Sequence, residues 1–395
     1  MEGAAPQPLH IVQIGSDDTV FQADAPSDTL RRQIDYAREL ARRRPGSCMT
    51  VIMLTYMRSA RTIEQEGLRI VPVVGSRLSR WPKLYGLLQR LHAARPIDVI
   101  TTQTVHTDAW VALWFGARHT TPVVGQIHYD LFAPSAQHER LGRGMLGGLR
   151  QAISVRLLRR MAAVRVDGGE IAPRLRAAHV QNVAVIPIPV TMALDPMTKR
   201  RSPEPLVLFV GRLAPQKNLG LWLRVAQRVA ERVPQAQFEL VGDGPLLEEL
   251  RAETLRLHLE ERVKFSGHIA YSKLDQVYNR AGVFLLTSNY EGLVRVVIEA
   301  SLHGVPVVAT AISGVRDIIS HGETGFLHAQ EDVEGLAASV IRLLEDPAFA
   351  SQIGRRGEQS VREHYDPERL TREWVTLLIN SARRSPMDVN HRSLS

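Results

Sequence analysis

Two basic residues in the second half of the chain have the type and spacing to bind an anionic ligand. Arg212 and Lys217 are five positions apart in a loop that begins with Gly211, directly after the apolar run Leu206–Val210. A glycine after a strand lets the backbone approach a ligand closely, and two cations before a helix N-terminus suit a diphosphate. An ordinary strand–helix turn with solvated charges fits the same residues, so the spacing alone leaves both interpretations open.

Two acidic residues form a second candidate group. Glu291 and Gly292 follow the apolar run Val283–Leu286, whereas Glu299 is the one acidic residue in the apolar helix expected over 294–302. An unpaired buried carboxylate is costly, so Glu299 needs a partner. Ligand hydroxyls, such as those of a ribose, would supply one. Backbone groups or an arginine would do so equally well, and this structural alternative remains open.

Three further candidates each stand where an apolar run ends. Gly242 begins the sequence Gly-Asp-Gly-Pro, which is not a dinucleotide fingerprint because Leu247 occupies the third glycine position; we expect a tight turn near a ligand. Gly15 ends the first apolar run and could allow a phosphate to approach. His128 follows the run Val123–Ile127, and a single histidine there is also compatible with a purely structural role.

The elements that must position these residues are short apolar runs that alternate with longer helical patterns. This alternation predicts α/β domains with parallel sheets, in which ligands bind at the carboxyl ends of the strands. The runs expected to be strands are 10–14, 49–54, 70–74, 99–102, 123–127, 183–186, 206–210, 238–241, 283–286 and 305–309.

A proline-rich polar stretch divides the chain near 187–205, because proline removes backbone donors and disfavours helix. The length of 395 residues also suits two domains. The predicted organisation is an N-terminal domain over 1–190, a linker over 191–204, a C-terminal domain over 205–365, a C-terminal helix over 366–384 that crosses back to the N-terminal domain, and a loose tail over 385–395.

Composition excludes several classes of protein. A hydrophobic fraction of 44% and a charged fraction of 23% are typical of globular domains and not of disordered chains. The single cysteine, Cys48, rules out an internal disulfide and a multi-cysteine zinc site, and indicates a reducing compartment. No stretch reaches the roughly 18–20 apolar residues of a membrane span.

The basic residues concentrate in the N-terminal half. Residues 1–190 hold 24 Lys and Arg against 15 Asp and Glu, whereas residues 191–395 hold 25 against 26. This asymmetry indicates an anionic partner, although the high arginine content could equally reflect codon bias. The arginines within 140–165 accompany apolar residues at helical spacing, which predicts a basic helix on anionic lipid. A helix packed on its own domain, with arginines reaching water, is the alternative.

Six motifs follow one another in the C-terminal half, from about 206 to 365. They are Gly211-Arg212 with Lys217-Asn218, Gly242-Asp243-Gly244-Pro245, Phe265-Ser266-Gly267, the Glu291 and Glu299 pair, Gly304-Val305-Pro306-Val307-Val308, and Gly322 with Thr324-Gly325. With these motifs this half resembles the family-4 retaining glycosyltransferases of the GT-B fold. The resemblance implies two Rossmann-like, doubly wound domains that face each other across a cleft. It also implies a nucleotide-sugar donor held mainly by the C-terminal domain.

The resemblance also implies roles for individual residues. Arg212 and Lys217 would neutralise the donor diphosphate, Glu299 would bind the ribose, and Glu291 would bind hydroxyls of the donor sugar. His128 would lie near the reacting sugar. The backbone positions implied in donor binding are Gly15, Gly211, Gly242, Gly292, Leu293, Val294 and Arg295. Val294 departs from the family, which commonly has glycine or proline there, and this puts the identity of the donor sugar in doubt.

No Asp-x-Asp sequence is present to hold a metal on the diphosphate. We therefore expect no metal and no cofactor, with cationic residues and helix N-termini stabilising the leaving group. The resemblance implies retention at the anomeric carbon, for which front-face transfer is one route.

The predicted activity is transfer of a sugar from a nucleotide-diphosphate sugar to a hydroxyl acceptor in bacterial polysaccharide or glycolipid assembly. Expected partners are the donor, a glycan or polyprenyl-diphosphate-linked acceptor and an anionic membrane surface, with no nucleic acid. The expected location is the cytoplasm, including the cytoplasmic face of the inner membrane. A GT-B nucleotide-sugar epimerase or hydrolase and a non-catalytic nucleotide-sugar-binding protein are the alternatives.

Overall fold

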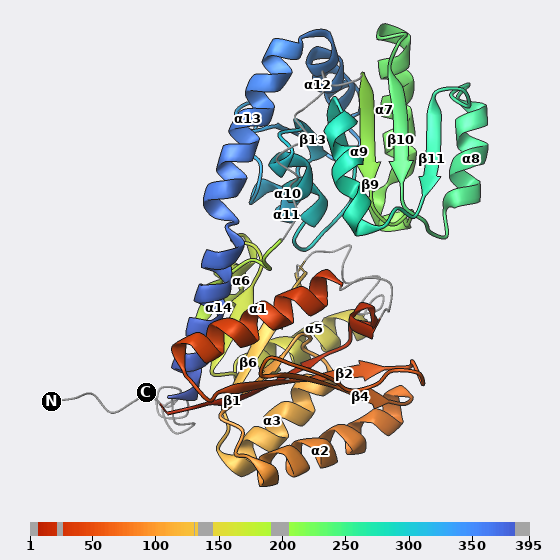
Figure 1. Cartoon of the computed structure of the whole chain (residues 1–395). Helices are drawn as coiled ribbons and strands as arrows, with labels where there is room; N and C mark the ends of the chain where they lie inside the picture. Colours follow the sequence, from red (N-terminus) through yellow and green to blue (C-terminus); the bar gives the residue numbers. More distant parts are fainter. Residues whose placement is uncertain (1–6, 22–26, 130, 133–144, 191–204, 384–395) are drawn as a thin grey trace, which may run out of the picture. The chain divides into compact units, whose positions relative to one another are not determined.

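The computed structural model describes residues 7–21, 27–129, 131–132, 145–190 and 205–383. They form two compact units, one of Met1–Pro189 with Pro367–Ser395 and the other of Val190–Asp366 (Figure 1). The predicted linker 191–204 and the tail 385–395 lie outside the described residues.

The N-terminal unit contains an eight-stranded sheet with the order β3-β4-β2-β1-β5-β6-β7-β8. Its pairs are parallel except for β3, which runs antiparallel to β4 at the sheet edge. The strands are β1 His10–Gly15, β2 Cys48–Thr55, β3 Ile63–Gln65, β4 Leu68–Val74, β5 Val99–Thr102, β6 Val123–Ile127, β7 Ala163–Val166 and β8 Val183–Val185.

Helices cover both faces of this sheet, because successive strand residues point to opposite sides and both sides are apolar. On one side Val12 and Ile100 pack with helices α2 Arg77–Ala94, α3 Thr107–His119, α5 Met145–Leu158 and α6 Ile171–Ala177. On the other side Ile11 and Val99 pack with η1 Asp18–Phe21, α1 Asp28–Arg43 and α14 Pro367–Ala382.

The last helix, α14, is part of the N-terminal unit although it follows the C-terminal unit in sequence. It packs beside α1 (Figure 1). Trp374 is fully buried there, with its ring 6.4 Å from the ring of Tyr36 and 4.7 Å from the guanidinium of Arg165. One face of the N-terminal sheet is therefore covered jointly by α1 and by a helix that follows the C-terminal unit in sequence.

The prediction of a basic helix through Arg165 is wrong. Helix α5 ends at Leu158, and Arg165 lies in the buried strand β7. Its Nε and Nη2 atoms donate to the carbonyls of Ile186 and Pro187, each at 2.7 Å. A buried arginine is tolerated when its donors are satisfied in this way. Arg140 and Arg143 lie outside the described residues.

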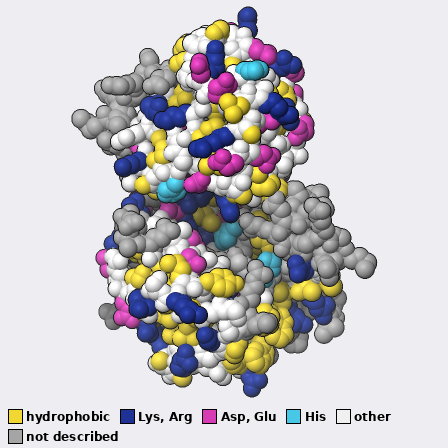
Figure 2. Space-filling model, turned by 90° about the vertical axis from the view of Figure 1, so that its right-hand side faces the viewer, with side chains coloured by type: hydrophobic (Ala, Val, Ile, Leu, Met, Phe, Trp, Pro, Cys, Tyr) yellow, Lys and Arg dark blue, Asp and Glu magenta, His cyan; other side chains and the backbone are white. Residues whose placement is uncertain are grey.

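The C-terminal unit contains a six-stranded, fully parallel sheet with the order β11-β10-β9-β12-β13-β14. Figure 2 shows basic and acidic side chains interspersed over this unit, at the top of the view. Its strands are β9 Leu206–Val210, β10 Gln237–Val241, β11 Val263–Gly267, β12 Val283–Leu286, β13 Val307–Thr310 and β14 Phe326–His328. Its helices are η3 Pro215–Lys217, α7 Leu219–Arg232, α8 Leu247–Arg256, η4 Tyr271–Lys273, α9 Leu274–Arg280, α10 Arg295–Leu302, α11 Ser313–Arg316, α12 Val333–Glu345 and α13 Pro347–His364.

The predicted α/β class is confirmed, since both units are parallel sheets covered by helices. Each of the ten predicted strands overlaps a strand of the structure, and the structure adds β3, β7, β11 and β14. Among the described helices none is both long enough and apolar enough to cross a bilayer.

Candidate functional site

The loops that follow β9 and β12 are joined at the carboxyl edge of the C-terminal sheet. The two strands are hydrogen-bonded neighbours, so their loops emerge side by side. The amide of Asn289 donates to the carbonyl of Gln216 at 2.8 Å, and the hydroxyl of Thr287 donates to the carbonyl of Lys217 at 3.0 Å. These bonds hold the predicted cationic loop against the predicted acidic loop.

Lys217 and Glu291 form an ion pair at this junction, and each side chain is 11% exposed. The ammonium of Lys217 donates to Oε1 of Glu291, and the hydroxyl of Ser288 donates to the same oxygen at 2.8 Å. No described residue donates to Oε2 of Glu291. An ammonium has three N–H donors and a carboxylate accepts on both oxygens. The pair therefore retains donors for an anion and an acceptor for a hydroxyl.

Arg212 lies in the same loop but is exposed. None of the described residues accepts a hydrogen bond from its guanidinium or pairs with it. The structure thus places the two predicted cations differently, since Lys217 is held by Glu291 whereas Arg212 extends from the loop into solvent.

Gly211 and Gly242 contact each other, and this contact explains why position 242 requires glycine. Their φ angles are +155° and +133°. A Cβ on Gly242 would lie 1.9 Å from the carbonyl oxygen of Gly211, which no side chain could tolerate. The amide of Gly242 donates to the carbonyl of Gly267 at 2.8 Å. Close packing of loop on loop therefore accounts for this glycine without any ligand.

Val294 fits the turn before α10 without strain. Its φ of −89° is ordinary for a side-chain-bearing residue, and the side chain is 2% exposed. The preceding loop is packed tightly, because a Cβ on Gly314 would lie 1.9 Å from the carbonyl oxygen of Gly292. Leu293 packs partly buried against the same core. The departure from the family pattern at Val294 therefore adds core contacts.

Glu299 is held by residues of its own chain. It is 3% exposed, and its Oε2 accepts a hydrogen bond from the hydroxyl of Tyr278 at 2.9 Å. Its Oε1 lies 3.7 Å from Nη2 of Arg295, the first residue of α10. Burial, with the charge of Glu299, raises the pKa of Tyr278 well above its ordinary value and that of Tyr271 to about 12. The structural alternative for Glu299 is therefore realised here, and its ribose role stays a prediction.

In the N-terminal unit, His128 forms a pair with a residue that the sequence did not suggest. Its Nδ1 lies 2.8 Å from Oδ2 of Asp167, which is 4% exposed. A carboxylate only accepts, so Nδ1 carries the proton and Nε2 of a neutral ring is an acceptor. That buried Nε2 has no hydrogen-bond partner among the described residues. Asp130, two residues after His128 in the sequence, lies outside the described residues.

The sequence does not single out Asp167, because it follows β7, most of which falls within the predicted basic helix over 140–165. Strands β6 and β7 are parallel neighbours, so the residues after them meet at one sheet edge. Gly15 ends β1 at the carboxyl edge of the same sheet. A Cβ there would lie 2.1 Å from Oε1 of Gln103, a flexible side chain.

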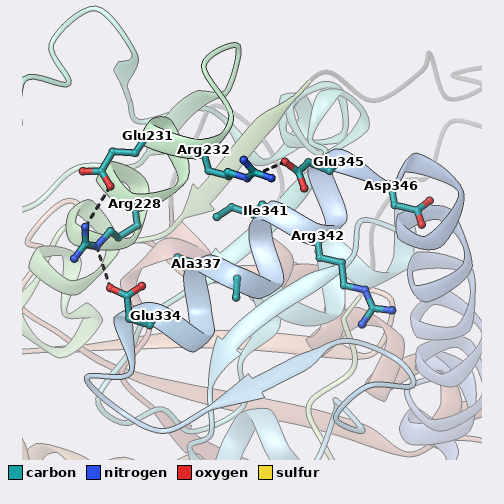
Figure 3. Close-up of a pocket in the computed structure, with 10 residues that line it drawn as sticks. Arg228, Glu231, Arg232, Glu334, Ala337, Ile341, Arg342, Glu345 and Asp346 are labelled. Carbon is teal, nitrogen blue, oxygen red and sulfur yellow. Dashed lines mark hydrogen bonds and ion pairs between the residues drawn. The ribbon is translucent and has the colours of Figure 1, made fainter.

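The structure brings together Lys217 with Glu291, Gly211 with Gly242, and Arg295 with Glu299. A surface groove between α7 and α12 contains none of these residues (Figure 3). There the guanidinium of Arg228 contacts Glu231 at 3.2 Å and Glu334 at 3.0 Å. Because these charges pair with each other, the groove offers little to an ionic ligand.

Two protein families match the two halves of the chain. Residues 194–360 match the family described as Glycosyl transferases group 1, and residues 33–191 match the Glycosyl transferase 4-like domain. The N-terminal match ends at residue 191 and the C-terminal match begins at residue 194, close to the boundary between the structural units, which lies between Pro189 and Val190.

Curated relatives agree with these families. The 2-deoxystreptamine N-acetyl-D-glucosaminyltransferase of Niallia circulans is 32% identical over 162 residues, which is 41% of this chain and 40% of that protein. The GDP-mannose-dependent alpha-(1-6)-phosphatidylinositol monomannoside mannosyltransferase of Mycolicibacterium smegmatis is 28% identical over 72% of this chain and 78% of its own. The chain spans about two fifths of the length of the first of these relatives.

Solved structures share the fold over nearly the whole chain. Sucrose-phosphate synthase from Thermosynechococcus elongatus superposes with a TM-score of 0.78 and 22% identity, covering 94% of this chain and 98% of its own. HepE of Anabaena, solved in complex with UDP, has a TM-score of 0.72 and 20% identity, and the match covers 94% of this chain and 100% of the HepE chain. With both halves matched by family and the fold shared throughout, the chain belongs to the family-4 glycosyltransferases of the GT-B fold.

Proposed function

We propose that this protein transfers a sugar, with retention at the anomeric carbon, from a nucleotide-diphosphate sugar to a hydroxyl acceptor. The observation that carries the proposal is the ion pair of Lys217 and Glu291 at the carboxyl edge of β9 and β12. It joins a cation suited to phosphate with a carboxylate oxygen suited to a sugar hydroxyl. A sugar phosphate presents both groups within one small ligand.

The leaving diphosphate gains negative charge as the bond to the sugar breaks. The ammonium of Lys217 and the guanidinium of Arg212 would stabilise that charge, which is the largest single contribution in many enzymes. No metal ion is assigned to the reaction, because two cationic side chains occupy the loop where the diphosphate is proposed to bind. Retention rests on the family resemblance, and NMR of the product's anomeric configuration tests it.

The proposed acceptor is a hydroxyl of a glycan or of a polyprenyl-diphosphate-linked sugar, in polysaccharide or glycolipid assembly. We place the reaction in the cytoplasm, including the cytoplasmic face of the inner membrane. Nε2 of His128, oriented by Asp167, would accept a hydrogen bond from a sugar hydroxyl.

Turnover assays with and without acceptor test the activity. UDP-, GDP- and ADP-sugars are first screened by thermal shift, since a ligand at about 100 times its Kd stabilises by roughly 2.7 kcal/mol. The stabilising donor is then incubated with glycan acceptors. A glycosylated product supports the proposal, acceptor-free conversion supports an epimerase or hydrolase, and binding without turnover supports a non-catalytic protein.

Sugar transfer is expected to continue at its full rate after the enzyme is treated with EDTA. The proposed site relies on the cations of Lys217 and Arg212, which chelation leaves unchanged. Initial rates are measured before and after chelation, and again after Mn²⁺ or Mg²⁺ is returned. A rate that falls in EDTA and recovers with either metal would contradict this assignment.

The two carboxylates are expected to respond differently to the same substitution. Glu291→Gln should weaken binding of the intact donor about ten- to a hundredfold, because a hydrogen bond to a charged group is worth roughly 1.5–3 kcal/mol. It should leave binding of the nucleoside diphosphate nearly unchanged. If Glu299 binds the ribose, Glu299→Gln should weaken both ligands equally. Calorimetric titration of each variant with both ligands measures the contrast.

The melting temperature distinguishes a structural role of Glu299 from a role in ribose binding. If this carboxylate serves only Tyr278 and Arg295, Glu299→Gln should lower the melting temperature without a ligand-specific loss. Equal losses for diphosphate and donor in both variants would refute the separate ribose and sugar roles.

A further inference from the structure

One side of the N-terminal unit exposes tryptophan in an unusual amount. Trp81, Trp110 and Trp114 are 39%, 56% and 45% exposed, whereas Trp222 and Trp374 are fully buried. Leu149 and Ile153 are also exposed, so helices α2, α3 and α5 carry five of the eight large apolar side chains that are exposed among the described residues. Scattered apolar side chains are normal on a surface, but a cluster marks an interaction site.

The exposed rings form one continuous surface across neighbouring helices. The rings of Trp114 on α3 and Tyr85 on α2 stack at 4.3 Å, and Trp110 lies 6.4 Å from Trp114. Trp81 precedes Tyr85 by four residues, so both lie on one side of α2. Helix α5 contacts α3, and Leu149 and Ile153 are likewise four residues apart. We call the outer surface of α2, α3 and α5 the tryptophan face.

The charge of the tryptophan face is almost entirely positive. Its three helices contain seven Lys and Arg and one acidic residue, Asp108. Asp108 and Arg80 are buried, whereas the basic residues Lys83, Arg90, Arg118, Arg150 and Arg156 are exposed. Helices α1 and α14, on the opposite side of the sheet, contain seven basic and five acidic residues. Figure 2 shows hydrophobic and basic side chains together at the lower end of the view.

We infer that the tryptophan face binds the surface of an anionic lipid bilayer, with its indole rings at the level of the headgroups. Tryptophan concentrates at the membrane–water interface because its ring is apolar and its N–H is polar. Lys and Arg beside such rings are attracted to anionic headgroups. The positive charge argues against a second copy of the chain as the occupant, because two such faces would repel each other.

The inference goes beyond the proposed transferase activity and does not require it. It also moves the predicted lipid contact away from the 140–165 segment as a whole, since Arg165 is buried in β7. A lipid-binding face would keep the N-terminal unit at the bilayer surface, where a lipid-linked acceptor would be found.

Vesicle co-sedimentation of the full chain tests the inference. Vesicles of phosphatidylcholine alone are compared with vesicles that contain one quarter phosphatidylglycerol, at low and high salt. We expect at least tenfold tighter binding to the anionic vesicles, and a loss of that difference at high salt. Brominated lipid should quench the exposed tryptophans, while Trp222 and Trp374 remain fluorescent.

The matched variants are Trp81→Ser/Trp110→Ser on the tryptophan face and Leu255→Ser on α8 of the C-terminal unit, where Leu255 is 59% exposed. The first should bind anionic vesicles about tenfold more weakly, and the second should bind as the parent does. The shift in melting temperature that nucleotide causes should be the same in both variants as in the parent. The experiment therefore distinguishes a loss of lipid binding from a loss of donor binding.

Three results would overturn the inference. They are no binding to either vesicle, equal binding to neutral and anionic vesicles, and unchanged binding by the Trp81→Ser/Trp110→Ser variant with a parental melting temperature. Analytical ultracentrifugation adds a fourth, because a dimer that the same variant abolishes, without vesicle binding, would assign the face to contact between copies of the chain.

Discussion

Replacing Lys217 with alanine is expected to lower kcat/KM for sugar transfer about 10²–10³-fold, the loss typical when one charge-stabilising donor is removed from a transition state. Lys217 is 9% exposed, so water cannot fully replace its ammonium. Arg212→Ala should act in the same direction. Steady-state kinetics of both variants with the donor found by thermal shift provide the measurement. Near-parental kinetics in both would remove these cations from the mechanism.

A second variant distinguishes catalysis from structural damage. Removing Lys217 also leaves the largely buried Glu291 without its partner, which by itself is destabilising. We therefore compare Lys217→Ala/Glu291→Gln with Glu291→Gln alone. If Lys217 acts on the diphosphate, the double variant should be about 10²-fold slower than the single one. If Lys217 only neutralises Glu291, the two should be equal. Lys273→Ala, at an exposed site in the same unit, controls for loss of charge.

His128→Ala is expected to lower kcat about 10²-fold, within the range for positioned proton donors and acceptors. Asp167 touches His128 and is proposed to act through it, so Asp167→Asn should lower kcat less and leave KM nearly unchanged. An amide can donate as well as accept, which weakens the preference for a proton on Nδ1 of the ring. Steady-state rates are measured for both variants and their parent.

Nitrogen-15 NMR of the histidine ring provides a readout that a merely structural role would not change. The parent should show His128 with the proton on Nδ1, and Asp167→Asn should raise the fraction with the proton on Nε2. An unchanged tautomer together with an unchanged kcat would show that Asp167 does not orient His128 for the reaction.

The strands that position the site were predictable because they are buried on both faces. Leu206–Val210 and Val283–Leu286 are uninterrupted apolar runs, as expected within a parallel sheet covered by helices. The contact between Lys217 and Glu291 was not predictable from such runs. It depends on β9 lying beside β12, and this strand order arises from packing across the whole unit.

The errors have a similar origin. Arg165 sits between valines in Ala163–Val166, so the sequence pattern places a strand with a buried arginine at the end of a basic helix and does not single out Asp167 after it. Arg165 can be buried because it donates to the carbonyls of Ile186 and Pro187, about twenty residues away in sequence. Glu299 was correctly expected to need a partner, but Tyr278, which supplies one, comes from another helix.

The position of α14 sets the order in which the protein can mature on the ribosome. The C-terminal unit ends at Asp366, whereas the N-terminal unit lacks Trp374 and its neighbours until α14 has been synthesised. At about 5–20 residues per second, the interval between residues 189 and 382 lasts roughly 10–40 s. During that time one face of the first sheet is covered by α1 but lacks the cover of α14 beside it. The nascent chain therefore presents an apolar surface that chaperones can bind, and the half synthesised first is the last to be completed.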